Sequence, residues 1–203
     1  PEGFPNVYND EASWSINLFQ PSVNLVLTGD ELSKVGDNVT YTLVVYNDCS
    51  SDSPNLAGTV SIEALKWSDN FTGLASGDNI TWSIPWTIPE TDSDPYGVTA
   101  DVTCSPTGFT NVYTDSACWS TNLFQPDFTI TKTASPEFAE VGDTITYTYT
   151  ITNTSSQDSP DLVLLSIIDN VFGDLSTQAV AAGLSMLSKD ESAGFTYMYV
   201  VKS

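Results

Sequence analysis

The strongest constraint on this chain is that it repeats itself. Residues 3–21 read GFPNVYNDEASWSINLFQP and residues 108–126 read GFTNVYTDSACWSTNLFQP, so 14 of these 19 positions are identical. Two further pairs follow in the same order and at nearly the same spacing: KVGDNVTYTLVVYND with EVGDTITYTYTITNT, and SDSPNL with QDSPDL. Three repeated pairs in one order indicate two copies of a unit of about a hundred residues.

Each copy has the pattern of a β protein. Apolar and aromatic residues alternate with Thr over 39–47 and again over 145–151, which is typical of a half-buried strand. Gly36 and Gly142, each followed by Asp, predict a tight turn before these strands. Further strands are expected at 23–28, 58–66, 79–88, 97–104 and 116–124, and then at 128–133, 162–168, 178–187 and 194–201.

About seven short strands per hundred residues, with frequent Pro and no long helical pattern, are typical of an immunoglobulin-like sandwich. We therefore predict an all-β chain with two tandem immunoglobulin-like β-sandwich domains, at 22–126 and 127–203. The strand 116–124 closes the first domain. The strand 194–201 is expected to be the counterpart of 97–104, so the second domain is predicted to lack its closing strand.

The missing strand is found in residues 1–21, which repeat the end of the first domain. We predict that this segment is a donor strand for the second domain of a neighbouring copy. Burying Trp14, Ile16 and Leu18 contributes roughly 1.5–3 kcal/mol each, against about 5–15 kcal/mol for a whole domain. The residues expected on the buried face are Val7, Ala12, Trp14, Ile16 and Leu18.

An open sheet edge favours pairing with another chain, and a head-to-tail contact that does not close into a ring builds a filament. Two mechanisms fit the sequence equally well. Separate subunits exchange the strand, or the chain is one period of a longer tandem-repeat protein in which Ser203 is bonded to the next Pro1. A fragment that does not assemble is the third interpretation.

The run TKTASPEFAEVGDTITYTYTITNTSS, residues 131–156, resembles a conserved-repeat family of bacterial and archaeal surface proteins, the domain of unknown function eleven. The matching pattern is Thr-Lys, a spacer, Gly-Asp, and a Thr-Tyr strand that ends in Asn. In the first repeat the early Thr-Lys is absent. The resemblance implies an immunoglobulin-like module in an extracellular stalk or fibre, and it implies no catalytic residues.

The charge excludes several functions. The chain has 26 acidic residues, five Lys, no Arg and no His, for a net charge of -21, so binding to nucleic acid or to an anionic membrane is not expected. The absence of His and of a nucleophile motif argues against an enzyme. No apolar run is long enough to span a bilayer, and the missing initiator Met indicates a mature or internal segment. We expect an extracellular filament subunit; the alternative is an adhesin or sugar-binding stalk module.

Carboxylates cluster at 8–11 and 90–97, where Ca²⁺ is possible, although solvated acidic loops are favoured because neither stretch matches a calcium loop. No cofactor is expected. Four Asn-x-Ser/Thr sequons are candidate glycan sites. Asn153 and Asn70 match Asn47 and Asn170 of the other repeat, which suggests structural roles. The candidates, in order, are Asn38, Asn79, Asn70 and Asn153.

The three Cys stand where the other repeat has Ser155, Val201 and Ser13, so the fold does not require them. Cys49 follows the second strand of the first domain and Cys104 ends the sixth. In an immunoglobulin-like sandwich both positions lie at the same end. We therefore predict a Cys49–Cys104 disulfide, which leaves Cys118 free or intermolecular; the alternative is three unpaired thiols.

Overall fold

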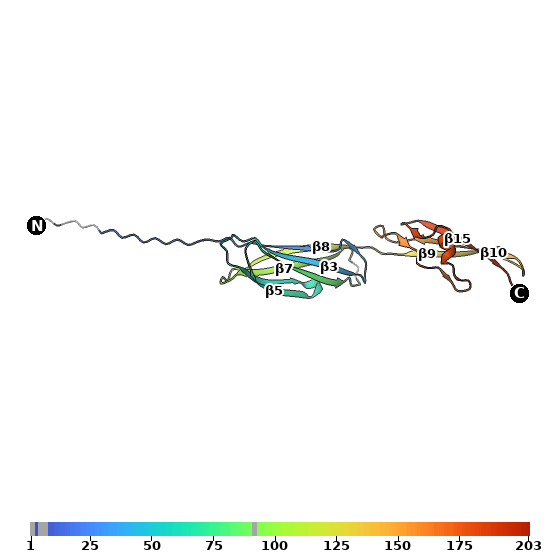
Figure 1. The fold of residues 1–203 in the computed structure, drawn as a ribbon, viewed down its shortest axis with the longest axis horizontal. Helices are drawn as coiled ribbons and strands as arrows, with labels where there is room; N and C mark the ends of the chain where they lie inside the picture. Colours follow the sequence, from blue (N-terminus) through green and yellow to red (C-terminus); the bar gives the residue numbers. More distant parts are fainter. Residues whose placement is uncertain (1–2, 4–7, 91–92) are drawn as a thin grey trace. The chain divides into compact units, whose positions relative to one another are not determined.

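The computed structural model describes residue 3 and residues 8–90 and 93–203, and it is an all-β structure with several sheets, compatible with β-sandwich architecture (Figure 1). The first repeat, residues 22–126, contains a three-stranded sheet of order β1-β3-β6 and a five-stranded sheet of order β2-β8-β7-β4-β5. The first sheet comprises β1 (Val23–Thr28), β3 (Asn38–Asn47) and β6 (Asn79–Thr87). The second comprises β2 (Leu32–Ser33), β4 (Leu56–Ile62), β5 (Trp67–Leu74), β7 (Tyr96–Pro106) and β8 (Tyr113–Leu123), with the short 3-10 helix η1 (Glu63–Leu65) between β4 and β5.

The second repeat, residues 127–203, has one three-stranded sheet of order β15-β10-β9 and two small two-stranded sheets, β11-β14 and β12-β13. Its elements are β9 (Phe128–Ser135), β10 (Thr144–Asn153), β11 (Leu162–Val163), β12 (Ile168–Asp169), β13 (Gly173–Asp174), α1 (Ser176–Ala181), β14 (Met186–Leu187) and β15 (Ser192–Val200).

Spatial proximity divides the chain differently from the sequence repeats. Some segments of the first repeat, among them β2 and the last residues of β8, belong to the same compact unit as the second repeat. One compact unit is 1–29, 40–86 and 97–119, and the other is 30–39, 87–96 and 120–203.

The alternation predicted for β3 is confirmed, because Tyr41, Leu43 and Val45 are fully buried while the residues between them are not. On β7, Ala100 and Val102 are buried in the same alternating way. Each strand therefore presents one apolar face to the interior, as its two-residue period requires.

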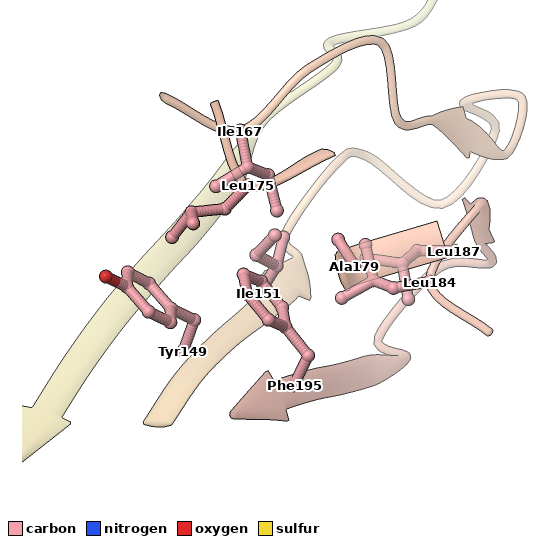
Figure 2. Packing of buried hydrophobic residues seen from close by; sticks show 8 residues of the cluster. All are labelled: Tyr149, Ile151, Ile167, Leu175, Ala179, Leu184, Leu187 and Phe195. Atoms are coloured by element: carbon pink, nitrogen blue, oxygen red, sulfur yellow. The ribbon is translucent and has the colours of Figure 1, made fainter. Parts of the chain in front are cut away.

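The core of the second repeat gathers on β10 and β15. Figure 2 shows Tyr149, Ile151 and Phe195 from these strands pointing toward Ile167 and Leu175, with the short helix beside them. The rings of Tyr149 and Phe195 stack with their centroids 4.9 Å apart. The other members of this cluster are Ala179, Leu184 and Leu187.

The predicted equivalence of 194–201 with 97–104 is wrong. In the first repeat the amide of Gly36 donates to the carbonyl of Ile88, directly after β6. In the second repeat the amide of Gly142, which matches Gly36, donates to the carbonyl of Val201, directly after β15. Val201 therefore corresponds to Ile88 and not to Cys104, and β15 corresponds to β6.

A second pair of hydrogen bonds gives the same alignment. The side-chain nitrogen of Asn47 donates to the Leu74 carbonyl over 2.8 Å, and that of Asn153 donates to the Leu187 carbonyl over 2.9 Å. Residues 127–203, all of which the structure describes, consequently lack counterparts of both β7 and β8. The prediction that only the closing strand is missing has to be corrected to two strands.

The segment of the second repeat that matches β4 is less regular than β4, because residues 127–203 contain no counterpart of β7 for it to pair with. In the first repeat β4 lies between β5 and β7 and buries Val60 and Ile62 completely. In the second repeat the matching segment is strand only at Leu162–Val163 and again at Ile168, the first residue of β12, and Ile168 is 75% exposed. Without a partner in the position of β7, this segment has no ladder along one edge and does not form a long strand.

We expect Asn47→Ala to lower the free energy of unfolding by about 2–4 kcal/mol, because it leaves the buried Leu74 carbonyl and Cys49 amide without a partner. The exposed Asn79→Ala should change it by less than about 0.5 kcal/mol. Urea unfolding of both variants measures the difference. Equal effects would contradict a structural role for Asn47.

Candidate functional site: an uncovered groove and an exposed copy of β8

The second repeat has an apolar groove of about 370 Å³ where the first repeat has covering strands. One wall is formed by β9 and β10, and the other by residues 162–168 and 184–187. Side chains that line it include Phe128, Ile130, Leu162, Leu164 and Met186.

A comparison of β9 with β1 shows why the groove is open. Leu25 and Ile130 occupy the same place, because each pairs with the matching residue of the next strand. Leu25 is 5% exposed and Ile130 is 52% exposed. In the first repeat β8 reaches this edge, where an Asp115 carboxylate oxygen accepts a hydrogen bond of 2.7 Å from the Leu25 amide. Nothing in the second repeat takes the place of β8.

The opening segment, residues 8–21, has nearly the sequence of β8 but forms no strand, and Figure 1 draws it without an arrow. Leu18 is 83% exposed, whereas its copy Leu123 is 3% exposed. Trp14 is 90% and Ile16 is 75% exposed, and Ala12 is exposed as well. Val7, the remaining residue predicted for the buried face, lies outside the described residues.

The junction that follows the opening segment is also a copy. The Gln20 carbonyl accepts from the Ser50 amide, and the Gln20 amide donates to the Ser50 hydroxyl. Gln125 and Ser156 repeat both hydrogen bonds after β8.

A side-chain hydrogen bond next to this contact is also the same in both repeats. The Asn17 amide nitrogen donates to Asp52, and that of Asn122 donates to Asp158. Since Asn17 corresponds to Asn122, the opening segment leads into the first repeat in the same way as β8 leads into the second. It therefore occupies the position of a β8 that precedes the first repeat.

A charged cluster lies around Lys132, in the middle of β9. Lys132 Nζ is 2.6 Å from Asp169 Oδ2, and the Tyr149 hydroxyl donates to the same oxygen over 2.7 Å. The other oxygen, Asp169 Oδ1, accepts from the amides of Val171 and Phe172. The hydrogen bonds from Lys132 and Tyr149 hold the pKa of Asp169 well below its usual range. The bond to Asp169 raises the pKa of Lys132, so both groups are ionised.

The predicted glycan sites differ in access. Asn38, Asn70 and Asn79 are exposed. Asn153 is 1% exposed, and its side-chain nitrogen, which would carry a glycan, donates to the Leu187 carbonyl. Asn153 is therefore a structural residue at the end of β10 and not a glycan acceptor in this fold.

The predicted Cys49–Cys104 disulfide is not formed, because Cys49, Cys104 and Cys118 are all free thiols. Cys49 Sγ accepts from the Ser22 amide over 3.1 Å and lies 3.3 Å from the Ser22 carbonyl as donor. Ser155 makes the same two contacts with Asp127 in the second repeat. Cys49 thus fills the role of a serine, while burial, with Cys49 nearby, raises the pKa of Cys104 to about 11.

Over the described ranges 8–90 and 93–203 no three acidic, Cys or His side chains gather into a metal-binding cluster, and Thr91 and Asp92 of the acidic loop lie outside these ranges. Among the described residues no helix has the length and apolarity to cross a membrane. No protein family, curated protein or solved structure matched the chain. The resemblance to domain of unknown function eleven therefore stays a prediction.

We expect the second repeat to lose stability as the pH falls below about 4, the ordinary pKa of an Asp side chain. The folded-state pKa of Asp169 is lowered, so its stabilising contribution is present above that value and is lost as the pH falls toward the folded pKa. Asp169→Asn should flatten this acid dependence, whereas the exposed Asp161→Asn should keep it. Thermal melts between neutral and acid pH measure both, and an unchanged profile for Asp169→Asn would refute the assignment.

Proposed function

We propose that this chain is a structural subunit of an extracellular filament, built from immunoglobulin-like domains and assembled head to tail. The opening segment of one copy occupies the groove of the next copy, in a contact here called the joint. The observation that carries the proposal is the pair of Leu residues at one strand position: Leu123 is buried within the first repeat, and Leu18 of the same segment is exposed. The surface that would bury Leu18 is the uncovered edge of the second repeat.

The first repeat supplies the register of the joint. There β2 runs parallel to β8 and pairs Leu32 with Asn122 and Ser33 with Leu123. Phe138 and Ala139 occupy the places of Leu32 and Ser33 in the second repeat, and Phe138 is 86% exposed. In the joint, Asn17 therefore pairs with Phe138 and Leu18 with Ala139.

The buried face of the donor supplies the affinity. Covering Trp14, Ile16 and Leu18 contributes roughly 1.5–3 kcal/mol each. Ordering the segment and losing the free motion of one subunit offset a large part of this gain. The two surfaces differ, so the contact is heterologous and extends into an open chain unless its rotation closes a ring. Addition of a donated strand is an established way to complete such folds.

The missing counterpart of β7 limits what the opening segment achieves alone. In the first repeat β8 lies between β2 and β7, so a donated strand without β7 has a neighbour for only part of its length. Joining Ser203 directly to Pro1 in a tandem chain would not supply β7 either, because residues 89–107 of the first repeat, which contain β7, would be replaced by only residues 202–203 and 1–2. Both forms of the proposal therefore leave the position of β7 empty, and strand exchange between copies is the form tested below.

A sugar-binding stalk module is the second candidate. The rings of Trp67 and Trp82 meet edge to face at 6.1 Å, and such a pair of aromatic rings is the feature of the first repeat that would hold a sugar. However, Trp82 is half-buried and its Nε1 donates to Asp69 over 2.8 Å. These contacts favour a packing role. Glycan binding that disappears in Trp67→Ala would favour the stalk module instead.

The proposal is tested by electron microscopy and sedimentation of the full chain. We expect wild-type filaments and a monomeric Leu18→Asp variant, because Leu18 is exposed in the free chain and buried only in the joint. Ser15→Asp is the matched control: the equivalent Ser120 stays exposed on β8, so this variant should still assemble. A monomeric wild type, or equal assembly of Leu18→Asp, would refute the proposal.

Peptides test the role of the missing β7. A chain that lacks residues 1–20 should bind a peptide of residues 96–123 at least about tenfold more tightly than one of residues 8–21, a difference of about 1.4 kcal/mol. The longer peptide supplies both strands, and in the first repeat β7 pairs with β4 from Leu56 to Ser61. Fluorescence anisotropy measures both affinities. Equal affinities would show that the position of β7 is not part of the groove.

A further inference from the structure

We propose that the joint, whose existence rests on the proposed function, is sealed by an amide bond between Lys132 of one copy and Asp10 of the next. The bond would join the side chains Nζ to Cγ, with Asp169 transferring the protons. The charged cluster around Lys132 on β9, the interior of the first repeat and the register of the donor all lead to the same pair of residues.

Lys132 is placed as an inward-facing residue with an unusual environment. Its Nζ lies 4.7, 5.4 and 5.0 Å from the ring centroids of Tyr147, Tyr149 and Phe172, in addition to its contact with Asp169. The side chain of Lys132 is still 36% exposed, because no strand covers β9. The lysine therefore stands on β9 beside the groove, two residues from the groove residue Ile130, among aromatic rings and at the place that a donor strand would cover.

The first repeat shows which residues lie around the position that matches Lys132. Leu27 takes the position of Lys132 there and is 4% exposed. Asp115 on β8 accepts from the amide of Leu25, which is two residues from Leu27 on the same face of β1. Asp10 of the opening segment corresponds to Asp115.

Transferred to the joint, this contact places the Asp10 carboxyl at the amide of Ile130. Lys132 is two residues from Ile130 and faces the same way, since alternate residues of a strand share a face. A lysine side chain is long enough to span that separation. Asp10 of one copy, and Lys132 and Asp169 of the next, would then surround one covered space.

Covering the groove changes the protonation of the cluster. In the open groove the lysine is an ammonium, which has no lone pair and cannot act as a nucleophile. Burial disfavours charged forms, so a covered ammonium facing two carboxylates transfers a proton more readily. A neutral amine beside a neutral carboxylic acid is the pair that can condense. The reaction therefore takes place only after the donor strand has covered the lysine.

The atoms of the step balance without any further reactant. The Nζ lone pair attacks Cγ of Asp10 and a C–N bond forms, Asp169 takes a proton from the nitrogen, and the Asp10 C–O bond breaks as its oxygen receives protons. One ammonium and one carboxylate become one secondary amide and one water. Nothing is oxidised or reduced.

Asp169 is the proton-transfer group and not the residue that is acylated. Its two oxygens accept four hydrogen bonds, from Lys132, Tyr149 and the amides of Val171 and Phe172. These bonds stabilise the carboxylate and oppose attack on its carbon. Asp115, the residue of the first repeat that corresponds to Asp10, accepts a hydrogen bond from one backbone amide, that of Leu25. The first repeat itself has Leu27 in place of the amine, so its own β8 cannot be sealed in this way.

The test is made on assembled full-length chain with thiols blocked and reductant present, so that Cys118 cannot form a disulfide. We expect a ladder of multimers that survives boiling in SDS. Mass spectrometry of a digest should find the peptides containing residues 10 and 132 joined, at the sum of their masses less one water. Lys132→Arg and Asp10→Ala should each lose the ladder, because guanidinium and methyl groups do not condense. Glu11→Gln, next to Asp10 on the opposite face, should keep it.

The outcomes separate this inference from the proposed function. Filaments that dissolve completely to monomers in SDS would overturn the amide bond and leave strand exchange intact. A ladder whose linked peptides do not contain residues 10 and 132 would overturn it as well. No filaments at all from the wild-type chain would overturn the proposed function, and the amide bond with it.

Discussion

The presence or absence of β8 determines how much of the apolar face of the edge strand, β1 or β9, is buried in each repeat. Where β8 is present, Leu25 and Leu27 on the edge strand are enclosed and the amide of Leu25 has a partner. Where it is absent, the matching face of β9 is exposed along its whole length, and Ile130 and Lys132 lie open. Two repeats in one chain thus act as a control for each other, because their sequences are similar and their covering strands are not.

Much of this architecture can be predicted from the sequence. The alternation through Tyr41, Leu43 and Val45 defines a buried face because every second residue of a strand points inward. The equivalence of Asn153 with Asn47 identified a structural residue, and both asparagines cap their strands with the same pair of hydrogen bonds. Repeats were informative here because a residue kept in both copies serves the unit rather than one surface.

Other features could not be predicted because they depend on which segments meet. Alternation shows that 194–201 is a strand but not which strand it pairs with, and its partner is β10. Cysteine spacing indicated that Cys49 and Cys104 lie at one end, but not that Cys49 Sγ is engaged by the Ser22 backbone. The contact of Lys132 with Asp169 joins residues 37 positions apart, and no local pattern marks it.

The parallel pairing of β2 with β8 has a mechanical consequence. Pulling on the two ends of the first repeat draws the start of β2 and the end of β8 in opposite directions. Because the strands run parallel, this tension loads their hydrogen bonds, which join Asn122 to Glu31 and Phe124 to Ser33, in shear and at the same time. Bonds that share a load resist rupture better than bonds that open one after another. A domain held in this way is suited to bear tension along the chain.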